Sequence, residues 1–307
     1  MEPQVGYEPA STDVLSAVLI GRNDTITQQP SIDGTVEGIN QESTKPSEFI
    51  ENLLSKTKSG HNIFKQLHRQ VISYPPSFDQ FLENSNLNRY PNVLCMDRTR
   101  VQLSTKYGKG DYYHASYVDS FTRKGGFVLA QAPFTDETEE IFWRMVIDAN
   151  PKMIVVLGAL TNGHEELMRC FWPTQNENVY SNSVRVCLIQ TEKICDQKVM
   201  KLQVNAGNEE LLQIKKICTK LNIKDDYPMI LVCPTGATRC GMYAAVDVIL
   251  DRIKKKKKVG AKATIQTVLA QRYGCFQFVE HYKIIHDIAY KYCVLSGMTS
   301  TDDQSRD

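Results

Sequence analysis

A cysteine and an arginine with five residues between them lie in a glycine-containing stretch of this 307-residue chain. Cys233 opens the stretch, Arg239 closes it, and Gly236 lies between them. A guanidinium can hold a phosphate through two hydrogen bonds, and a thiol in the same positive field tends to ionise. A thiolate beside a bound phosphate is a nucleophile for phosphoryl transfer. The spacing predicts a phosphate-binding loop, and the alternative is a buried structural cysteine beside a solvated arginine.

The residues on either side of this loop predict how it is held. Met229–Val232 is a short apolar run with β-branched residues, which is typical of a buried strand. From Ala244 onward, apolar residues recur at helical spacing. A loop between a strand and the first turn of a helix directs backbone N–H groups and the positive end of the helix dipole at an anion. The residues expected to bind the phosphate are Cys233, Gly236, Ala237, Thr238 and Arg239.

This stretch resembles the loop of the protein tyrosine phosphatases, whose usual form is His-Cys-x-x-Gly-x-x-Arg-Ser/Thr-Gly. Four residues match that form: Cys233, Gly236, Arg239 and Gly241. Two positions depart from it, with Val232 in place of the His and Cys240 in place of the Ser or Thr. The resemblance covers residues 47 to 295, with further dense matches at 111–119, 127–133 and 142–146. It implies an α/β fold, a twisted mixed sheet flanked by helices.

Two further segments gain expected roles from the resemblance. Asn88-Arg89-Tyr90 is similar to the family's Asn-Arg-Tyr segment, which implies that the Tyr90 ring stacks on a phosphotyrosine and sets the depth of the pocket. The alternative is a loop tyrosine half-packed on the surface. Asn92 stands where the family often has an Asp that holds the peptide backbone. Gln277 matches a glutamine that positions water for hydrolysis of the phosphocysteine.

The family's general acid has no counterpart in this sequence. A Trp-Pro-Asp loop should follow the expected strand Lys198–Val204, but the chain continues Asn-Ala-Gly-Asn-Glu-Glu, and the spacing of Leu211–Leu221 predicts a helix there. In the family the Asp of this loop protonates the leaving tyrosine oxygen, and a positioned general acid contributes roughly 10²–10⁴ in rate. Glu209 and Glu210 are expected to cap the helix instead of replacing that acid.

Composition limits the remaining classes of function. The 36 Lys and Arg nearly balance 35 Asp and Glu, so no specific nucleic-acid partner is expected. Apolar runs are too short for a membrane span, and no secretory signal is expected. Nine scattered cysteines without a Cys-x-x-Cys pair argue against a disulfide framework or a metal site. We expect no cofactor and no metal, and a reducing cytoplasmic location with the nucleus left open.

The chain divides into three expected parts. Residues 1–46 are polar and predicted to be a disordered tail, 47–295 form the phosphatase-like domain, and 296–307 are a polar tail. The run Lys254–Lys258 follows the helix after the phosphate loop. It is either a solvated helix end or a site for an anionic partner such as acidic lipid, nucleic acid or an import receptor.

Three interpretations of the function stay open. In the first, the protein binds phosphotyrosine proteins with little or no turnover, and shields them or competes with active phosphatases. In the second, it is a slow phosphatase that uses a cysteinyl-phosphate intermediate. In the third, it is a scaffold with a vestigial pocket. Its shortened loops resemble those of phosphatase-like proteins of polydnaviruses, the bracovirus type, and of nematode paralogues, and a viral member would act in the host cytoplasm.

Overall fold

The computed structural model describes residues 17–21, 43–57, 77–151, 153–162, 165–180, 184–194, 197–206, 209–214 and 227–298. Its strands are β1 (Ala17–Gly21), β2 (Arg100–Gln102), β3 (Tyr112–Val118), β4 (Phe127–Gln131), β5 (Met153–Leu157), β6 (Thr161–Asn162), β7 (Glu165–Glu166), β8 (Glu177–Tyr180), β9 (Val184–Ile194), β10 (Gln197–Ala206), β11 (Glu209–Ile214) and β12 (Met229–Cys233). Its α-helices are α1 (Pro46–Thr57), α3 (Asp79–Glu83), α4 (Asp136–Ala149), α5 (Thr238–Lys256), α6 (Ala261–Gln271) and α7 (Val279–Leu295).

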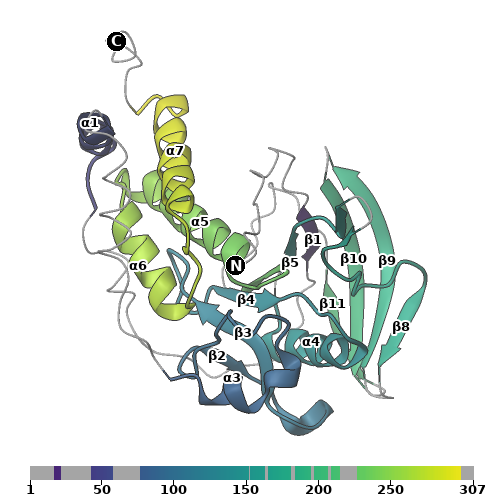
Figure 1. Cartoon of the computed structure of the whole chain (residues 1–307). Coiled ribbons are helices and arrows are strands. Elements are labelled where there is room, and N and C mark those ends of the chain that lie inside the picture. Colours follow the sequence, from purple (N-terminus) through teal and green to yellow (C-terminus); the bar gives the residue numbers. More distant parts are fainter. Residues whose placement is uncertain are drawn as a thin grey trace.

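Ten of the described strands form one mixed sheet with helices on both faces (Figure 1). The strand order is β2-β3-β4-β12-β5-β1-β10-β9-β8, and β11 pairs with β10 outside this path. Strand β12 is parallel to both of its neighbours, β4 and β5, whereas β3 and β4 are antiparallel. The predicted α/β fold with a mixed sheet is confirmed.

Side chains alternate between the two faces of the central strands. On β12, Leu231 and Cys233 belong to the core that packs against α5, α6 and α7. The intervening Val232 belongs to the core on the opposite face, beneath α4. Figure 1 shows α5, α6 and α7 on one side of the sheet and α4 on the other. The register therefore directs Cys233 toward α5 and Val232 away from it.

Helix α5 connects the loop after β12 to the core. Its buried side chains, Ala244, Ala245, Val248 and Ile249, recur at helical spacing, as predicted. Gly241 lies in its first turn, where a Cβ would stand 2.6 Å from the Cβ and Sγ of Cys275. Because only a glycine allows that approach, the segment before α7 packs directly on the start of α5.

The expected N-terminal tail contains one strand of the sheet. Ala17–Gly21 forms β1, which is antiparallel to β5 along its whole length and has one parallel pair with β10, Leu19 with Val199. A run of four apolar residues suits a position inside a sheet, where both faces are covered. The prediction of disorder is therefore wrong for these five residues, while 1–16 and 22–42 lie outside the described residues.

The segment after β10 is a second correction. Glu209–Ile214 forms strand β11, which pairs antiparallel with β10 from Leu202 to Ala206, and not the predicted start of a helix. The run Glu-Glu-Leu-Leu-Gln-Ile has too little periodicity to separate the two structures, and pairing with a preformed strand decides between them. The remainder of the predicted helix, residues 215–226, lies outside the described residues.

Candidate functional site

The loop that follows β12 lies where the sequence predicted it. The Cys233 carbonyl accepts hydrogen bonds from the backbone N–H of Ala132, at 2.9 Å, and of Gly236, at 3.0 Å. The first bond fixes the end of β12 beside β4, and the second closes a tight turn. Helix α5 then starts at Thr238. The loop therefore lies between the carboxyl end of a parallel strand and a helix N-terminus, which is a position suited to an anion.

Contacts with β4 and with Arg272 fix the shape of the loop. Gly236 has a φ of 62°, and a Cβ there would stand 2.2 Å from the backbone nitrogen of Gln131. Any other residue at this position would have to move β4, so the glycine is required. Arg272 is fully buried and donates to the carbonyl oxygens of Gly236, at 3.0 Å, and Thr235, at 3.4 Å. With these carbonyls held by the arginine below, the turn keeps one shape.

The Cys233 side chain is 1% exposed and is held as a thiolate near neutral pH. Burial alone would raise the pKa of this thiol, but hydrogen bonds from the side chain and backbone of Cys240, a hydrogen bond from Thr235 and the charge of Arg239 lower it to about 5. Burial and the neighbouring thiolate raise the pKa of Cys240 well above its usual value, so Cys240 is the protonated donor of this pair. The cysteine in place of Ser or Thr thus serves as a hydrogen-bond donor to Cys233.

Thr235 takes part in the loop in a way that sequence analysis missed. Its hydroxyl oxygen accepts hydrogen bonds from the backbone N–H groups of Ala237, at 3.2 Å, and Thr238, at 3.3 Å. The same oxygen lies 3.7 Å from the Cys233 Sγ. The residue before it is Pro234, which has no N–H to offer an anion. The Pro-Thr pair after Cys233 was the feature of the sequence that could have predicted this role, since the proline has no N–H and the threonine has a hydroxyl.

Arg239 is exposed at the mouth of the loop. A Cβ on Gly158, at the end of β5, would lie 2.9 Å from its Nη1 atom, so the guanidinium lies against a bare stretch of backbone. Within the described part of the chain, Arg239 has no hydrogen bond or ion pair. Its donors therefore face solvent, next to the thiolate whose pKa its charge lowers.

Gln131 connects the Tyr90 segment to the end of β4. It is fully buried, its Oε1 accepts from the Arg89 backbone N–H at 2.8 Å, and its Nε2 donates to the Leu87 carbonyl at 3.3 Å. It is also the strand partner of Cys233. Tyr90 is partly buried against the core that contains Cys233, and the Arg89 guanidinium lies 5.3 Å from its ring centre. The structure thus brings Tyr90 to the Cys233 side of the sheet, and stacking on a ligand stays a prediction.

Gln277 is less closely tied to the loop. It is exposed, and it makes no hydrogen bond to another described residue. Its Nε2 lies near Gly274, where a Cβ would stand 3.2 Å away. Its segment is adjacent to the loop through the Cys275–Gly241 contact, but the structure does not hold the amide against Cys233. Its role in positioning water stays a prediction.

Strand β11 follows β10 at the sequence position where the family's Trp-Pro-Asp loop is expected. Strands β10 and β11 pair antiparallel, and residues 207 and 208 between them lie outside the described residues. Nor is a described carboxylate among the groups that shift the pKa of Cys233. The thiolate and the guanidinium are therefore present without a carboxylic acid placed beside them in the described residues.

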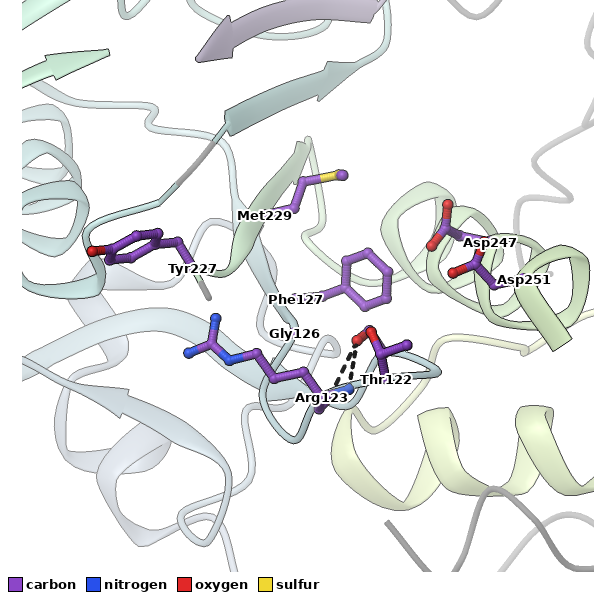
Figure 2. Close-up of a pocket in the computed structure, with 9 residues that line it drawn as sticks. Thr122, Arg123, Gly126, Phe127, Tyr227, Met229, Asp247 and Asp251 are labelled. Atoms are coloured by element: carbon purple, nitrogen blue, oxygen red, sulfur yellow. Dashed lines mark hydrogen bonds between the residues drawn. The ribbon is translucent and has the colours of Figure 1, made fainter. Parts of the chain in front are cut away.

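A separate small cavity lies at the opposite end of the sheet. Figure 2 shows it beside Phe127 and Met229, which begin β4 and β12, with Asp247 and Asp251 projecting from α5. Its volume is about 40 Å³. A water molecule needs roughly 10–15 Å³ of such space, so this cavity has room for a few waters and is too small for a phosphotyrosine side chain.

Comparison with known proteins gives a consistent result. The family model for protein-tyrosine phosphatase matches residues 84–217 and 201–291. Tyrosine-protein phosphatase Lar of Drosophila melanogaster is 28% identical over 284 residues, which are 82% of this chain and 14% of that protein. Receptor-type tyrosine-protein phosphatase epsilon of Rattus norvegicus is 29% identical over 252 residues, 73% of this chain and 36% of that protein. Receptor-type tyrosine-protein phosphatase C of Mus musculus is 26% identical over 257 residues, 75% of this chain and 20% of that protein.

Proposed function

The chain belongs to the protein-tyrosine phosphatase family, and from that premise we propose that it binds phosphotyrosine proteins with little or no turnover. By holding phosphorylated tyrosines it would shield them from active phosphatases and so interfere with phosphotyrosine signalling. The proposed partners are therefore phosphotyrosine-containing proteins, and the proposed setting is the cytoplasm. The chain spans only 14% of Lar and 36% of the epsilon phosphatase, so this proposal concerns the domain that they share.

One observation carries this proposal. The groups proposed to hold a phosphate are a thiolate at Cys233 and an exposed guanidinium at Arg239, in a loop whose carbonyl at Gly236 is bonded by Arg272. The sequence has no Trp-Pro-Asp segment after β10, and strand β11 follows there instead. Binding requires only the first set of groups, whereas release of a tyrosine also requires an acid.

A slow phosphatase is the second candidate, and the low pKa of Cys233 favours it. A thiol with a pKa of about 5 is almost entirely ionised at pH 7, so the nucleophile for a cysteinyl-phosphate intermediate is retained. The relatives named above are called tyrosine-protein phosphatases, and that activity is the one a working nucleophile would perform.

The deciding experiment measures binding and turnover with one ligand. A phosphotyrosine peptide and its unphosphorylated twin are titrated into the protein by calorimetry, and phosphate release from the same peptide is followed in parallel. We expect specific binding of the phosphorylated form without measurable release. Slow release would favour the slow-phosphatase alternative, and release at the rate of an ordinary family member would contradict the proposal. Absence of binding would favour a scaffold with a vestigial pocket.

The lysine run supports a separate proposal for an anionic partner. Lys254–Lys258 are all exposed at the end of α5. Lys255 is paired with Asp251 at 2.8 Å, and the Lys254 amine lies 5.8 Å from the Tyr292 ring centre. Among the described residues no helix is both long and apolar enough to cross a bilayer. Attachment of this corner to an anionic surface would depend on its charge, and the alternative is a solvated helix end favoured by the helix dipole.

Replacing Lys256 and Lys258 by Gln should weaken binding to phosphatidylserine vesicles by about 30-fold, since a lysine near an anionic surface contributes roughly 1 kcal/mol. Vesicle sedimentation at low and high salt measures the effect, because about 1 M salt shortens the Debye length to roughly 3 Å. The control replaces two exposed lysines of β9 and β10, Lys193 and Lys198, and removes the same charge elsewhere. Equal binding by both variants would leave the solvated helix end as the explanation.

A further inference from the structure

The hydroxyl of Thr235 uses its whole hydrogen-bonding capacity inside the loop. A hydroxyl has one donor and two acceptor positions. Both acceptor positions are used by the backbone N–H groups of Ala237 and Thr238, at 3.2 and 3.3 Å. The proton is directed at the Cys233 sulfur, 3.7 Å away, because the ionised sulfur can only accept. The hydroxyl therefore lies within reach of both the Cys233 sulfur and the two N–H groups.

Of the loop's other N–H groups, those of Thr235 and Arg239 have no hydrogen-bond partner among the described residues, and the rest are absent or already bonded. Pro234 has none, and the Gly236 N–H is bonded to the Cys233 carbonyl. The backbone of Cys240 is hydrogen-bonded to the Cys233 sulfur. The N–H groups of Ala237 and Thr238 are thus a large share of what the loop can offer to a phosphate oxygen, and Thr235 holds both.

From this arrangement we propose that the Thr235 hydroxyl occupies the position of a phosphate oxygen, and that a phosphate group binds by displacing it. The inference rests on the proposed phosphate-binding function. It adds that the Thr235 hydroxyl competes with a phosphate oxygen for the N–H groups of Ala237 and Thr238. Rotation of the Thr235 side chain frees the two N–H groups for the anion, and the hydroxyl must then find water or another acceptor. Thr235 is in this sense a positioning residue that limits affinity, and Arg239 supplies the attraction that overcomes it.

A simpler account of the same contacts is that Thr235 only satisfies the N–H groups at the start of α5. Side-chain oxygens of Thr commonly do this at helix N-termini, and their loss lowers stability. Both accounts predict a lower melting temperature when the hydroxyl is removed. Only displacement predicts that the protein without the hydroxyl binds phosphate more tightly, so affinity separates the two.

The test compares Thr235→Val, which keeps the shape and removes the hydroxyl, with Thr235→Ser, which keeps the hydroxyl. Calorimetric titration with inorganic phosphate and with a phosphotyrosine peptide should show affinity about three- to tenfold higher for Thr235→Val, because two hydrogen bonds no longer have to be broken. Thr235→Ser should behave as the unmodified protein does. Scanning calorimetry verifies that each variant is folded.

A second measurement follows the ionisation of the Cys233 thiol instead of phosphate affinity. The Thr235 hydroxyl is one of the groups that lower the pKa of Cys233, so its removal should move the midpoint of iodoacetamide modification of Cys233 to higher pH. A shifted midpoint with unchanged or weaker phosphate affinity would overturn the displacement proposal and leave the proposed function intact. If neither the unmodified protein nor Thr235→Val binds phosphate, the displacement proposal and the proposed function both fail.

Discussion

Arg239→Ala should lower the affinity for a phosphotyrosine peptide by about 10- to 150-fold, which corresponds to the 1.5–3 kcal/mol of a hydrogen bond to a charged group. The guanidinium is exposed and has no partner within the described part of the chain, so its donors are available to an incoming phosphate. No carboxylate of the described residues pairs with it, so its attraction for a phosphate would not be shared with an ion pair. Calorimetric titration of the peptide measures the loss.

Two matched variants show whether geometry or charge is responsible. Arg239→Lys keeps the positive charge and loses the planar pair of donors, so it should recover only part of the lost affinity. Arg185→Ala removes another exposed charge, on β9, where the side chain is 56% exposed and pairs with Glu177 at 3.7 Å. It should bind the peptide as the unmodified protein does. Unchanged affinity in Arg239→Ala, with the fold intact, would exclude the binding function.

The central part of the fold was predictable because local and global signals agree there. Met229–Val232 reads as a buried strand, and the helical spacing from Ala244 onward specifies α5. The loop between them is set by Gly236, whose positive φ and contact with β4 admit no side chain. In each case the residue type and its spacing are enough to predict the strand, the helix or the turn.

The two errors in the fold come from segments whose structure depends on a partner strand. Ala17–Gly21 is a short apolar run within a polar region, and Glu209–Ile214 has a pattern compatible with helix or strand. Neither segment contains a sequence pattern that indicates which strand it pairs with. Pairing with β5 determines the structure of Ala17–Gly21, and pairing with β10 determines that of Glu209–Ile214. Such long-range contacts cannot be predicted from a short stretch of sequence.

The site was predicted in its residues more than in its internal contacts. Placing Cys233 and Arg239 at one loop needs only their spacing and the flanking elements. The donation from Cys240 to the Cys233 sulfur, and the bonds to the Thr235 hydroxyl, depend on side-chain directions inside a turn. A cysteine is a weak hydrogen-bond donor by residue type, and burial beside the thiolate keeps Cys240 protonated so that it can donate.

The chemistry of the leaving group decides how much activity this site can have. With Cys233 ionised above a pH of about 5, attack on phosphorus needs no further activation at neutral pH. Departure of a tyrosine is the difficult step, because its unperturbed pKa is about 10 and its oxygen must be protonated as it leaves. An acid in position contributes roughly 10²–10⁴ to that step. The described residues place none beside the sulfur, so the missing factor should appear with a tyrosine and not with a more acidic phenol.

We therefore expect negligible phosphate release from phosphotyrosine peptides, and residual activity toward para-nitrophenyl phosphate that Cys233→Ser abolishes. The ratio of the two rates should exceed that of an ordinary family member by about 10²–10⁴, since only the peptide needs the acid. Glu209→Gln and Glu210→Gln, measured in the same way, test the two carboxylates that begin β11. Unchanged rates would show that neither donates the proton. Robust peptide hydrolysis lost in Cys233→Ser would mean that another residue supplies the acid, and the protein would then be a working phosphatase.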